Sequence, residues 1–250
     1  MTFNWHDVPE LRPFEGWSAS DHLAPARTAL VLVDLQYGSG SRHHGIGRRM
    51  QEEGREHEGV ERFDRIETRV VPNTVRLLDT FRRHGGFVVY LTVNPLLSDF
   101  RDIPRNRRGL AAWKSARAVP IDPANPPREH QVLDEVRPAA DELVLNKATI
   151  GGFNSSSLHS VLRSAGIDTI VVCGVSTNSC IESTVRSAAD RSFKVILAED
   201  ACGAALDEFH EQAVATMQGQ FCVIASTDDV CKAMEDELEC AAQSALESQA

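Results

Sequence analysis

The sequence predicts an α/β fold in which a mostly parallel sheet of six strands lies between two layers of helices, a three-layer α-β-α arrangement. Two observations carry this prediction. Short apolar runs rich in β-branched residues alternate along the chain with segments of helical periodicity, which is typical of strand-helix-strand units. Several runs are apolar at every position, as expected for parallel strands that are buried on both faces.

Each predicted strand is a short run dominated by Val, Leu, Ile and Ala, and a turn or a helical segment follows it. The expected bounds are Ala29–Leu35, Phe87–Val93, Glu142–Lys147, Thr169–Val175, Lys194–Ala198 and Cys222–Ala225.

The predicted helices occupy the intervals between the strands and the end of the chain. The first stops at His84-Gly85-Gly86 and the second at Ala165-Gly166, and a strand follows each stop at once. The expected helices lie near Arg69–His84, Ser156–Ala165, Cys180–Ser192, Asp207–Gln218 and Asp228–Glu247.

Two polar segments interrupt this alternation, and we expect both to be irregular. One runs from Tyr37 to about Glu61, and the other from Asn94 to about Ala140. Loops of this length in a compact domain commonly cover a site or form oligomer contacts. Because both leave the carboxyl ends of the first two strands, we expect them to form walls of a site there.

Composition indicates one globular domain over residues 1–250, with a core at about 27–230 between an N-terminal arm and a C-terminal helix. The net charge of -10 argues against a nucleic-acid partner. The basic run Arg101–Arg108 is either a solvated loop or a segment that attracts an anionic substrate. No apolar run approaches a membrane span of ~20 residues. Six cysteines without metal spacing and the absence of a signal-peptide pattern predict a cytoplasmic protein.

Cys180 has the sequence environment of a nucleophile. It follows a fully apolar strand and precedes a helical pattern whose apolar stripe is Ile181, Val185 and Ala188. The carboxyl end of a strand is where open α/β sheets bind ligands, and a helix N-terminus favours thiolate over thiol. A free cysteine is more often a small core residue. The polar residues just before Cys180, however, suit an exposed turn better than a core.

Asp34 and Lys147 are candidate partners of Cys180, because each ends a predicted strand at the same edge of the sheet. A buried carboxylate there would accept the thiol proton, and a cation would stabilise the thiolate. The alternatives are an aspartate that caps a turn and a surface lysine at a strand end. The occurrence of three complementary groups at one edge favours the catalytic interpretation.

Four motifs give the chain a resemblance to the isochorismatase-like cysteine hydrolases, a superfamily that includes nicotinamidase, N-carbamoylsarcosine amidohydrolase, biuret hydrolase and the ureidoacrylate amidohydrolases. The resemblance covers roughly Ala29 to Asp229. The motifs are Val33-Asp-Leu-Gln36, Lys147-Ala-Thr-Ile-Gly-Gly-Phe153, Gly174-Val-Ser-Thr-Asn-Ser-Cys180 and Ala198-Glu-Asp-Ala-Cys-Gly203.

The resemblance implies a strand order of 3-2-1-4-5-6 and a catalytic triad of Asp34, Lys147 and Cys180. It also implies a non-proline cis peptide bond between Val175 and Ser176, with the N–H groups of Ser176 and Cys180 forming an oxyanion hole. Family members are dimers or tetramers, so we expect a homo-oligomer.

Two departures from known patterns predict that the protein uses neither a metal nor a cofactor. Nicotinamidases carry an Asp-x-His metal motif where this chain has Asn94-Pro-Leu-Leu-Ser-Asp-Phe100, and His43 and His44 are adjacent, which is a poor chelating spacing. The segment Gly38-Ser-Gly40 lacks the third glycine of a dinucleotide site.

These features predict an amidohydrolase that acts through a thiolate acyl-enzyme on a small amide, ureido or carbamoyl substrate. The alternatives are hydrolysis of a larger amide or lactam, and a catalytically silent member that binds or assembles. Intact triad residues argue against the silent alternative. The expected substrate contacts lie on segments that reach the carboxyl edge of the sheet: Gln36, Tyr37, Asn94, Trp113, Phe153 and Asn178. Trp113 and Phe153 either stack on a flat substrate or anchor a core or interface.

Overall fold

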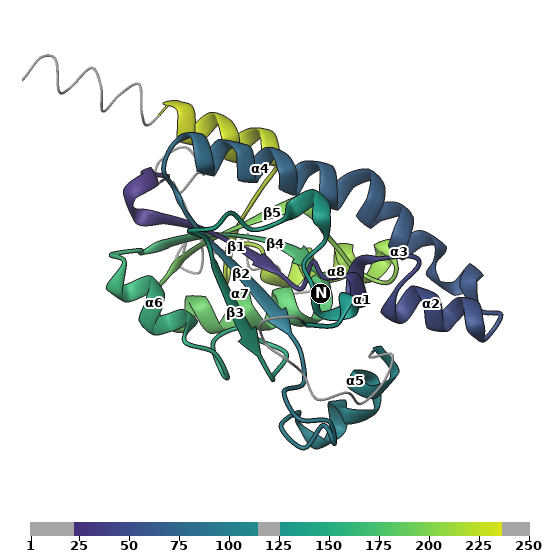
Figure 1. Cartoon of the computed structure of the whole chain (residues 1–250). Helices are drawn as coiled ribbons and strands as arrows, with labels where there is room; N and C mark the ends of the chain where they lie inside the picture. The colour runs from purple at the N-terminus through teal and green to yellow at the C-terminus, as the bar shows by residue number, and fades with distance from the viewer. Residues whose placement is uncertain (1–22, 115–125, 237–250) are drawn as a thin grey trace, which may run out of the picture.

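The computed structural model describes residues 23–114 and 126–236, with the backbone alone at residues 113 and 114. Its centre is a six-stranded sheet in which every pairing is parallel and the order is β3-β2-β1-β4-β5-β6 (Figure 1). The predicted fold class and strand order are therefore confirmed. The strands are β1 (Thr28–Val33), β2 (Phe87–Val93), β3 (Leu143–Lys147), β4 (Thr169–Val175), β5 (Lys194–Gly203) and β6 (Val223–Ala225).

Helices cover both faces of the sheet. Helix α4 (Val71–Arg83) lies on one face beside the helix at 227–236, to which it is joined by an Arg76–Asp228 ion pair (Figure 1). Helices α6 (Leu158–Ser164) and α7 (Glu182–Ala189) cover the opposite face, and α8 (Asp207–Met217) packs against α7. Because β1 and β4 lie at the centre between these layers, every residue of both strands is buried.

Two strand ends differ from the prediction by two or more residues, for local backbone reasons. Strand β1 ends at Val33 rather than Leu35, because Asp34 has a positive φ of 54° and turns the chain out of the sheet. Strand β5 continues to Gly203 because it pairs with β4 again after a register shift near Gly174. At Gly174, with φ of 119°, an added Cβ would lie 2.2 Å from the Val33 carbonyl oxygen, so only glycine fits.

The prediction that the segment from Tyr37 to about Glu61 is irregular is wrong. This segment forms α1 (Tyr37–Gly40), α2 (Gly45–Glu52), the short η5 (Glu56–Gly59) and the start of α3 (Val60–Arg65). Helix α3 continues through the π-helical turn η6 (Ile66–Val70) into α4. The helical stripe of α3 was hidden because two of its buried positions are arginines, Arg62 and Arg65.

The segment from Asn94 to about Ala140 is irregular, as predicted, except for short helical turns. These are η7 (Arg105–Arg107), α5 (Arg108–Lys114), η8 (Arg128–His130) and η9 (Asp134–Val136). Figure 1 shows α5 at the carboxyl end of the sheet, displaced from the three layers.

Two further expectations concern the whole chain. None of the helices in the described ranges has the length and apolar character needed to cross a membrane. Within those ranges the cysteines are free, namely Cys173, Cys180, Cys202, Cys222 and Cys231. The expected N-terminal arm and most of the expected helix Asp228–Glu247 lie outside the described residues.

Candidate active site

Three strand ends bring Asp34, Lys147 and Cys180 together at the carboxyl edge of the sheet. Asp34 follows β1, Lys147 ends β3 and Cys180 follows β4; their exposed fractions are 2%, 0% and 8%. Because β2 lies between β1 and β3, the long lysine side chain spans the intervening strand to reach Asp34. The surface-lysine alternative is therefore wrong, since Lys147 is buried, and no hydrogen bond of the described residues has the Asp34 carboxylate capping a turn.

The Asp34 carboxylate has one occupied and one unoccupied oxygen. Its Oδ2 accepts a hydrogen bond of 2.9 Å from the Lys147 Nζ. Its Oδ1 is buried without a hydrogen-bond partner in the described part of the chain. A buried polar atom without a partner is costly in a folded protein, so Oδ1 is suited to an interaction made during the reaction.

The Lys147 ammonium connects the two other groups. It donates to Asp34 and, at 3.3 Å, to the carbonyl of Thr149, and it interacts with the Cys180 sulfur. Burial alone would lower the Lys147 pKa, but the negative charges of Asp34 and Cys180 outweigh burial and raise the pKa above 10.5. The charged form of Lys147 is therefore stabilised beside the thiol.

Cys180 lies in a π-helical turn, η10 (Thr177–Ile181), between β4 and α7. The turn begins after a cis peptide bond between Val175 and Ser176, as the family resemblance implies. The backbone carbonyl of Cys180 accepts a hydrogen bond of 2.6 Å from the Thr184 hydroxyl. Single π-turns within helices are frequent at functional sites.

The other buried cysteines have no such surroundings. Burial raises the pKa of the Cys173 and Cys222 thiols to about 12, and it also raises that of Cys202. These thiols stay protonated at neutral pH and act as small core side chains, whereas Cys180 faces a pocket.

A hydrogen-bonded network lies behind the turn Thr177–Ile181, which carries Cys180, and holds it in position. The Thr177 hydroxyl lies 2.9 Å from Nδ1 of His210 on α8, and the Arg65 guanidinium lies 2.8 Å from Nε2 of the same ring. Arg65 can only donate to Nε2, and Glu199 Oε2, 3.3 Å from the same nitrogen, can only accept. The shorter Arg65 contact favours the tautomer in which Nδ1 carries the proton and donates it to Thr177. Arg65 also pairs with Asp207 at 2.8 Å.

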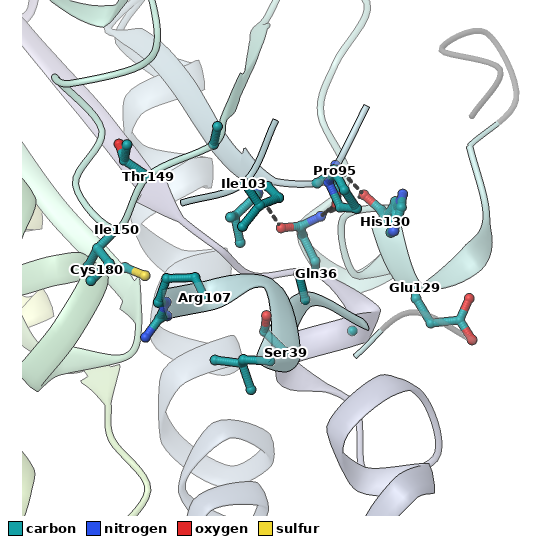
Figure 2. A pocket seen from close by; sticks show the side chains of 16 residues that line it. Gln36, Ser39, Pro95, Ile103, Arg107, Glu129, His130, Thr149, Ile150 and Cys180 are labelled. Carbon is teal, nitrogen blue, oxygen red and sulfur yellow. Dashed lines mark hydrogen bonds between the residues drawn. The ribbon is translucent and has the colours of Figure 1, made fainter. Parts of the chain in front are cut away.

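A pocket opens above Cys180 at the carboxyl edge of the sheet (Figure 2). Its empty space, counted together with the open mouth, is about 620 Å³. Both polar segments contribute to its walls, as predicted. The lining residues include Gly38 and Ser39 from the first segment, and Asn94, Pro95, Ile103, Arg107, Leu110, Ala111, Glu129 and His130 from the second.

Two of the expected substrate contacts, Gln36 and Asn94, line the pocket. The Gln36 amide is already used: Nε2 donates to the Asn94 Oδ1 at 2.7 Å and to the His130 carbonyl at 2.8 Å, and Oε1 accepts from Val93 N–H. Gln36 therefore connects the strand end to the pocket wall, and Asn94 Nδ2, whose contact with the His130 carbonyl is long at 3.5 Å, is the better placed donor.

Three expected contacts do not line the pocket. The Phe153 ring is buried against Phe193, with centroids 5.7 Å apart, so it anchors the core. The Tyr37 ring lies under the Arg128 guanidinium, 3.7 Å from its carbon to the ring centroid. The Asn178 side chain is exposed on the turn Thr177–Ile181. The side chain of Trp113 lies outside the described residues.

Sequence reasoning did not name Thr149, Ile150 and His130 as site residues, and it included Arg107 only within the basic run Arg101–Arg108. Thr149 and Ile150 follow the Lys147 strand end, and Arg107 and His130 come from the second polar segment. The motif Lys147-Ala-Thr-Ile was a signal for the first two. Nothing in the local sequence distinguishes Arg107 from its neighbouring arginines.

The comparisons with known proteins agree with this geometry. The family model for the isochorismatase domain matches residues 28–229. The chain belongs to the isochorismatase family. Among its relatives is an uncharacterised family member from Bacillus subtilis, YwoC, which is 31% identical over 185 residues that cover 74% of this chain and 82% of the relative.

Other isochorismatase relatives carry functional names. The ureidoacrylate amidohydrolase RutB of Pseudomonas syringae is 28% identical over 239 residues, covering 90% of this chain and 92% of the relative. Among solved structures, a cysteine hydrolase from Pseudomonas syringae pv. phaseolicola is similar with a TM-score of 0.68 and 24% identity, covering 86% of this chain and 95% of the other. That structural likeness concerns the fold.

The predicted lack of a metal remains a prediction for this isochorismatase family member. In the described ranges, no three His, Cys, Asp or Glu side chains gather as a metal-binding group. His43 is exposed, and the His44 ring packs edge-on against Tyr37 and contacts the Ser41 hydroxyl.

Proposed function

We propose that this protein is a cysteine amidohydrolase that cleaves the C–N bond of a small amide, ureido or carbamoyl substrate through a thiolate acyl-enzyme. The observation that carries the proposal is the buried Asp34–Lys147 pair beside Cys180 at the floor of a small pocket. The names of the relatives, an amidohydrolase and a cysteine hydrolase, support the same class of reaction.

In the first half-reaction, Asp34 accepts the thiol proton and the Cys180 sulfur attacks the substrate carbonyl carbon. The resulting oxyanion is held by the backbone N–H groups of Ser176 and Cys180. As the tetrahedral intermediate collapses, the C–N bond breaks and the nitrogen takes the proton from Asp34. Ammonia or an amine leaves, and a thioester remains.

In the second half-reaction, Asp34 removes a proton from water, which attacks the thioester carbonyl. The C–S bond breaks, the acid product leaves and Cys180 returns as a thiolate. Lys147 orients Asp34 and stabilises the thiolate, and the negative charges of these two groups raise the Lys147 pKa.

The pocket wall supports a further restriction on the substrate. Figure 2 shows the Arg107 side chain directed into the pocket on the side where Cys180 lies. No ion pair among the described residues involves Arg107, and Glu129, a carboxylate that lines the same pocket, is paired with Arg48 at 3.1 Å. We therefore favour substrates that carry a carboxylate or another anionic group.

Two alternatives to this function remain testable. A larger amide or lactam would have to enter a pocket that two polar segments narrow. A silent member that binds or assembles would have no use for an activated thiol. Rapid alkylation of Cys180 would contradict the silent alternative, and a slow rate equal to that of the half-buried Cys231 would support it.

The deciding experiment is an ammonia-release assay across a panel of small amides, ureas and carbamoyl compounds, with and without a carboxylate. The proposal predicts turnover of at least one ureido or carbamoyl acid without added metal, and unchanged turnover after prolonged chelation. No release across the panel, or a rate that chelation abolishes and zinc restores, would contradict it. A cytoplasmic location and the lack of nucleic-acid and membrane partners stay predictions.

A further inference from the structure

Arg62 is a buried guanidinium next to the candidate nucleophile. It lies on α3 with 7% of its surface exposed. Its Nη2 and Nε donate to the Ser39 carbonyl at 2.8 Å and 3.3 Å, and its Nη1 donates to the Ser176 hydroxyl at 3.0 Å. Ser176 is the residue after the cis peptide bond and a proposed member of the oxyanion hole.

The acceptors of Arg62 are neutral, and this distinguishes it from Arg65, the other buried arginine of the same helix. Arg65 has a carboxylate partner in Asp207 at 2.8 Å. No carboxylate pairs with Arg62 in the described part of the chain. Burying a cation without an anion is unfavourable, so such groups are retained where the charge is used.

The guanidinium that lacks a carboxylate partner is held near Cys180 by its hydrogen bond to Ser176, which comes four residues before that thiol. Burial lowers the pKa of Arg62 to about 10, and the neighbouring Cys180, as an anion, acts in the opposite direction. Lys147 and Arg62 are the two buried cations whose charges act on Cys180, and Asp34, which pairs with Lys147, takes the thiol proton in the proposed mechanism. With that proton on Asp34, the Cys180 thiolate is the anion that the two cations stabilise.

Two further sets of charged groups surround Cys180. Arg107, His130 and Glu129 come from the pocket wall, and Glu129 is already paired with Arg48. Behind the turn, the network of His210, Arg65, Glu199 and Asp207 contacts Thr177.

We infer that Arg62 is a positioning residue. Together with Lys147 it stabilises Cys180 as a thiolate, and it fixes Ser176 at the start of the turn Thr177–Ile181. The inference rests on the proposed function for its purpose, but it concerns the ionisation of one thiol and is measurable without a substrate. Arg62 contacts Ser176 and Ser39 rather than the reacting atoms.

The test is the pH dependence of Cys180 alkylation by iodoacetamide, followed by mass spectrometry of the peptide that contains Cys180. The reagent is neutral, so removing a cation does not change its attraction to the site. We expect the wild-type midpoint to lie well below the ordinary thiol value of about 8.5. Arg62→Gln should raise the midpoint by at least about one unit and slow alkylation at neutral pH about tenfold.

Two comparison variants make the result specific. Arg69→Gln removes the same charge from an exposed position in η6, the turn that follows α3. This variant should leave the midpoint of Cys180 alkylation unchanged. Arg62→Lys keeps the charge and should restore most of the low midpoint. A folded Arg62→Gln protein with the wild-type midpoint would overturn the inference.

A double variant decides the case if Arg62→Gln does not fold. Asp34→Asn with Lys147→Met removes the buried ion pair as a neutral unit and leaves Arg62 as the buried cation. The thiol should then still ionise below about 8.5, and a midpoint at or above that value would overturn the inference. In the wild-type protein, a low midpoint without ammonia release from any compound of the panel would contradict the proposed function and leave the inference standing.

Discussion

At the scale of single residues, the site consists of side chains that are unusual for their local sequence and burial. A carboxylate follows an apolar strand at Asp34, a lysine without exposed surface ends β3, and a thiol occupies a turn of polar residues. Each group is stabilised by the others: the ammonium lies 2.9 Å from the carboxylate and also contacts the thiol. Removing one member therefore alters the protonation of the remaining two.

Asp34→Asn should lower kcat by roughly a hundred- to ten-thousandfold, because an amide cannot accept the thiol proton. Asparagine tolerates the positive φ of 54° at this position, so the backbone should be retained. Steady-state kinetics with a circular-dichroism check of folding measure the effect. A folded variant with near-wild-type kcat would exclude Asp34 as the base.

Arg107→Ala should raise KM for carboxylate-bearing substrates by roughly tenfold or more, because a charge-assisted hydrogen bond contributes about 1.5–3 kcal/mol. Substrates without an anionic group should be affected much less. Arg105→Ala is the matched control, since Arg105 is exposed and does not line the pocket. Equal KM changes for both variants would show that the effect is general electrostatics and not recognition by Arg107.

At the scale of elements, the sequence predicted those whose apolar pattern is regular and missed those stabilised by polar groups. All six strands were found. The apolar pattern is clearest in β1 and β4, which are apolar at nearly every buried position. Helix α3 was missed because Arg62 and Arg65 occupy buried positions, where their hydrogen bonds replace apolar contacts. The π-turn at Cys180 was expected only as the start of a helix, since π-turns have no distinct apolar period.

The same reasoning explains which site residues could be predicted. Asp34, Lys147 and Cys180 follow strands, so the order of the sheet places them at one edge. Phe153 and Tyr37 were placed by proximity in sequence, but the direction of an aromatic side chain depends on its packing partners, Phe193 and Arg128. Arg107 belongs to a run of similar arginines, and only the path of the chain selects it.

The turn that carries Cys180 should weaken in mild acid. Burial and the nearby Arg65 hold the pKa of His210 below its usual value of 6.5. The unfolded chain therefore takes up a proton as pH falls through 6.5 while folded His210 stays neutral, so stability present above pH 6.5 is lost below it. Burial lowers the His130 pKa in the same direction.

Thermal unfolding at about pH 7.5 and 5.5 checks this expectation. His210→Asn should be less stable at the higher pH but should lose less of its Tm on acidification than wild type. His43→Asn, at an exposed position, should follow wild type. Equal acid-induced losses in all three proteins would contradict the assignment to His210.

At the scale of the whole molecule, the isochorismatase fold supplies the sheet edge, and the two polar segments supply the pocket that covers it. We predict a homo-oligomer, a dimer or tetramer. Exposed apolar side chains at Leu96 and Leu97 beside the pocket wall, and at Val144 on the edge strand β3, are consistent with contacts between chains. Light scattering should give a mass of two or four chains, and the mass of a single chain would contradict the prediction.

The central claim is covalent catalysis by Cys180, and turnover by Cys180→Ala tests it most directly. On a substrate that the wild-type protein hydrolyses, this variant should lose at least about a thousandfold in kcat while its Tm stays close to wild type. Cys231→Ala, which removes a half-buried thiol beside α4, should keep full activity. A Cys180→Ala protein that retains most of the wild-type rate would contradict the mechanism.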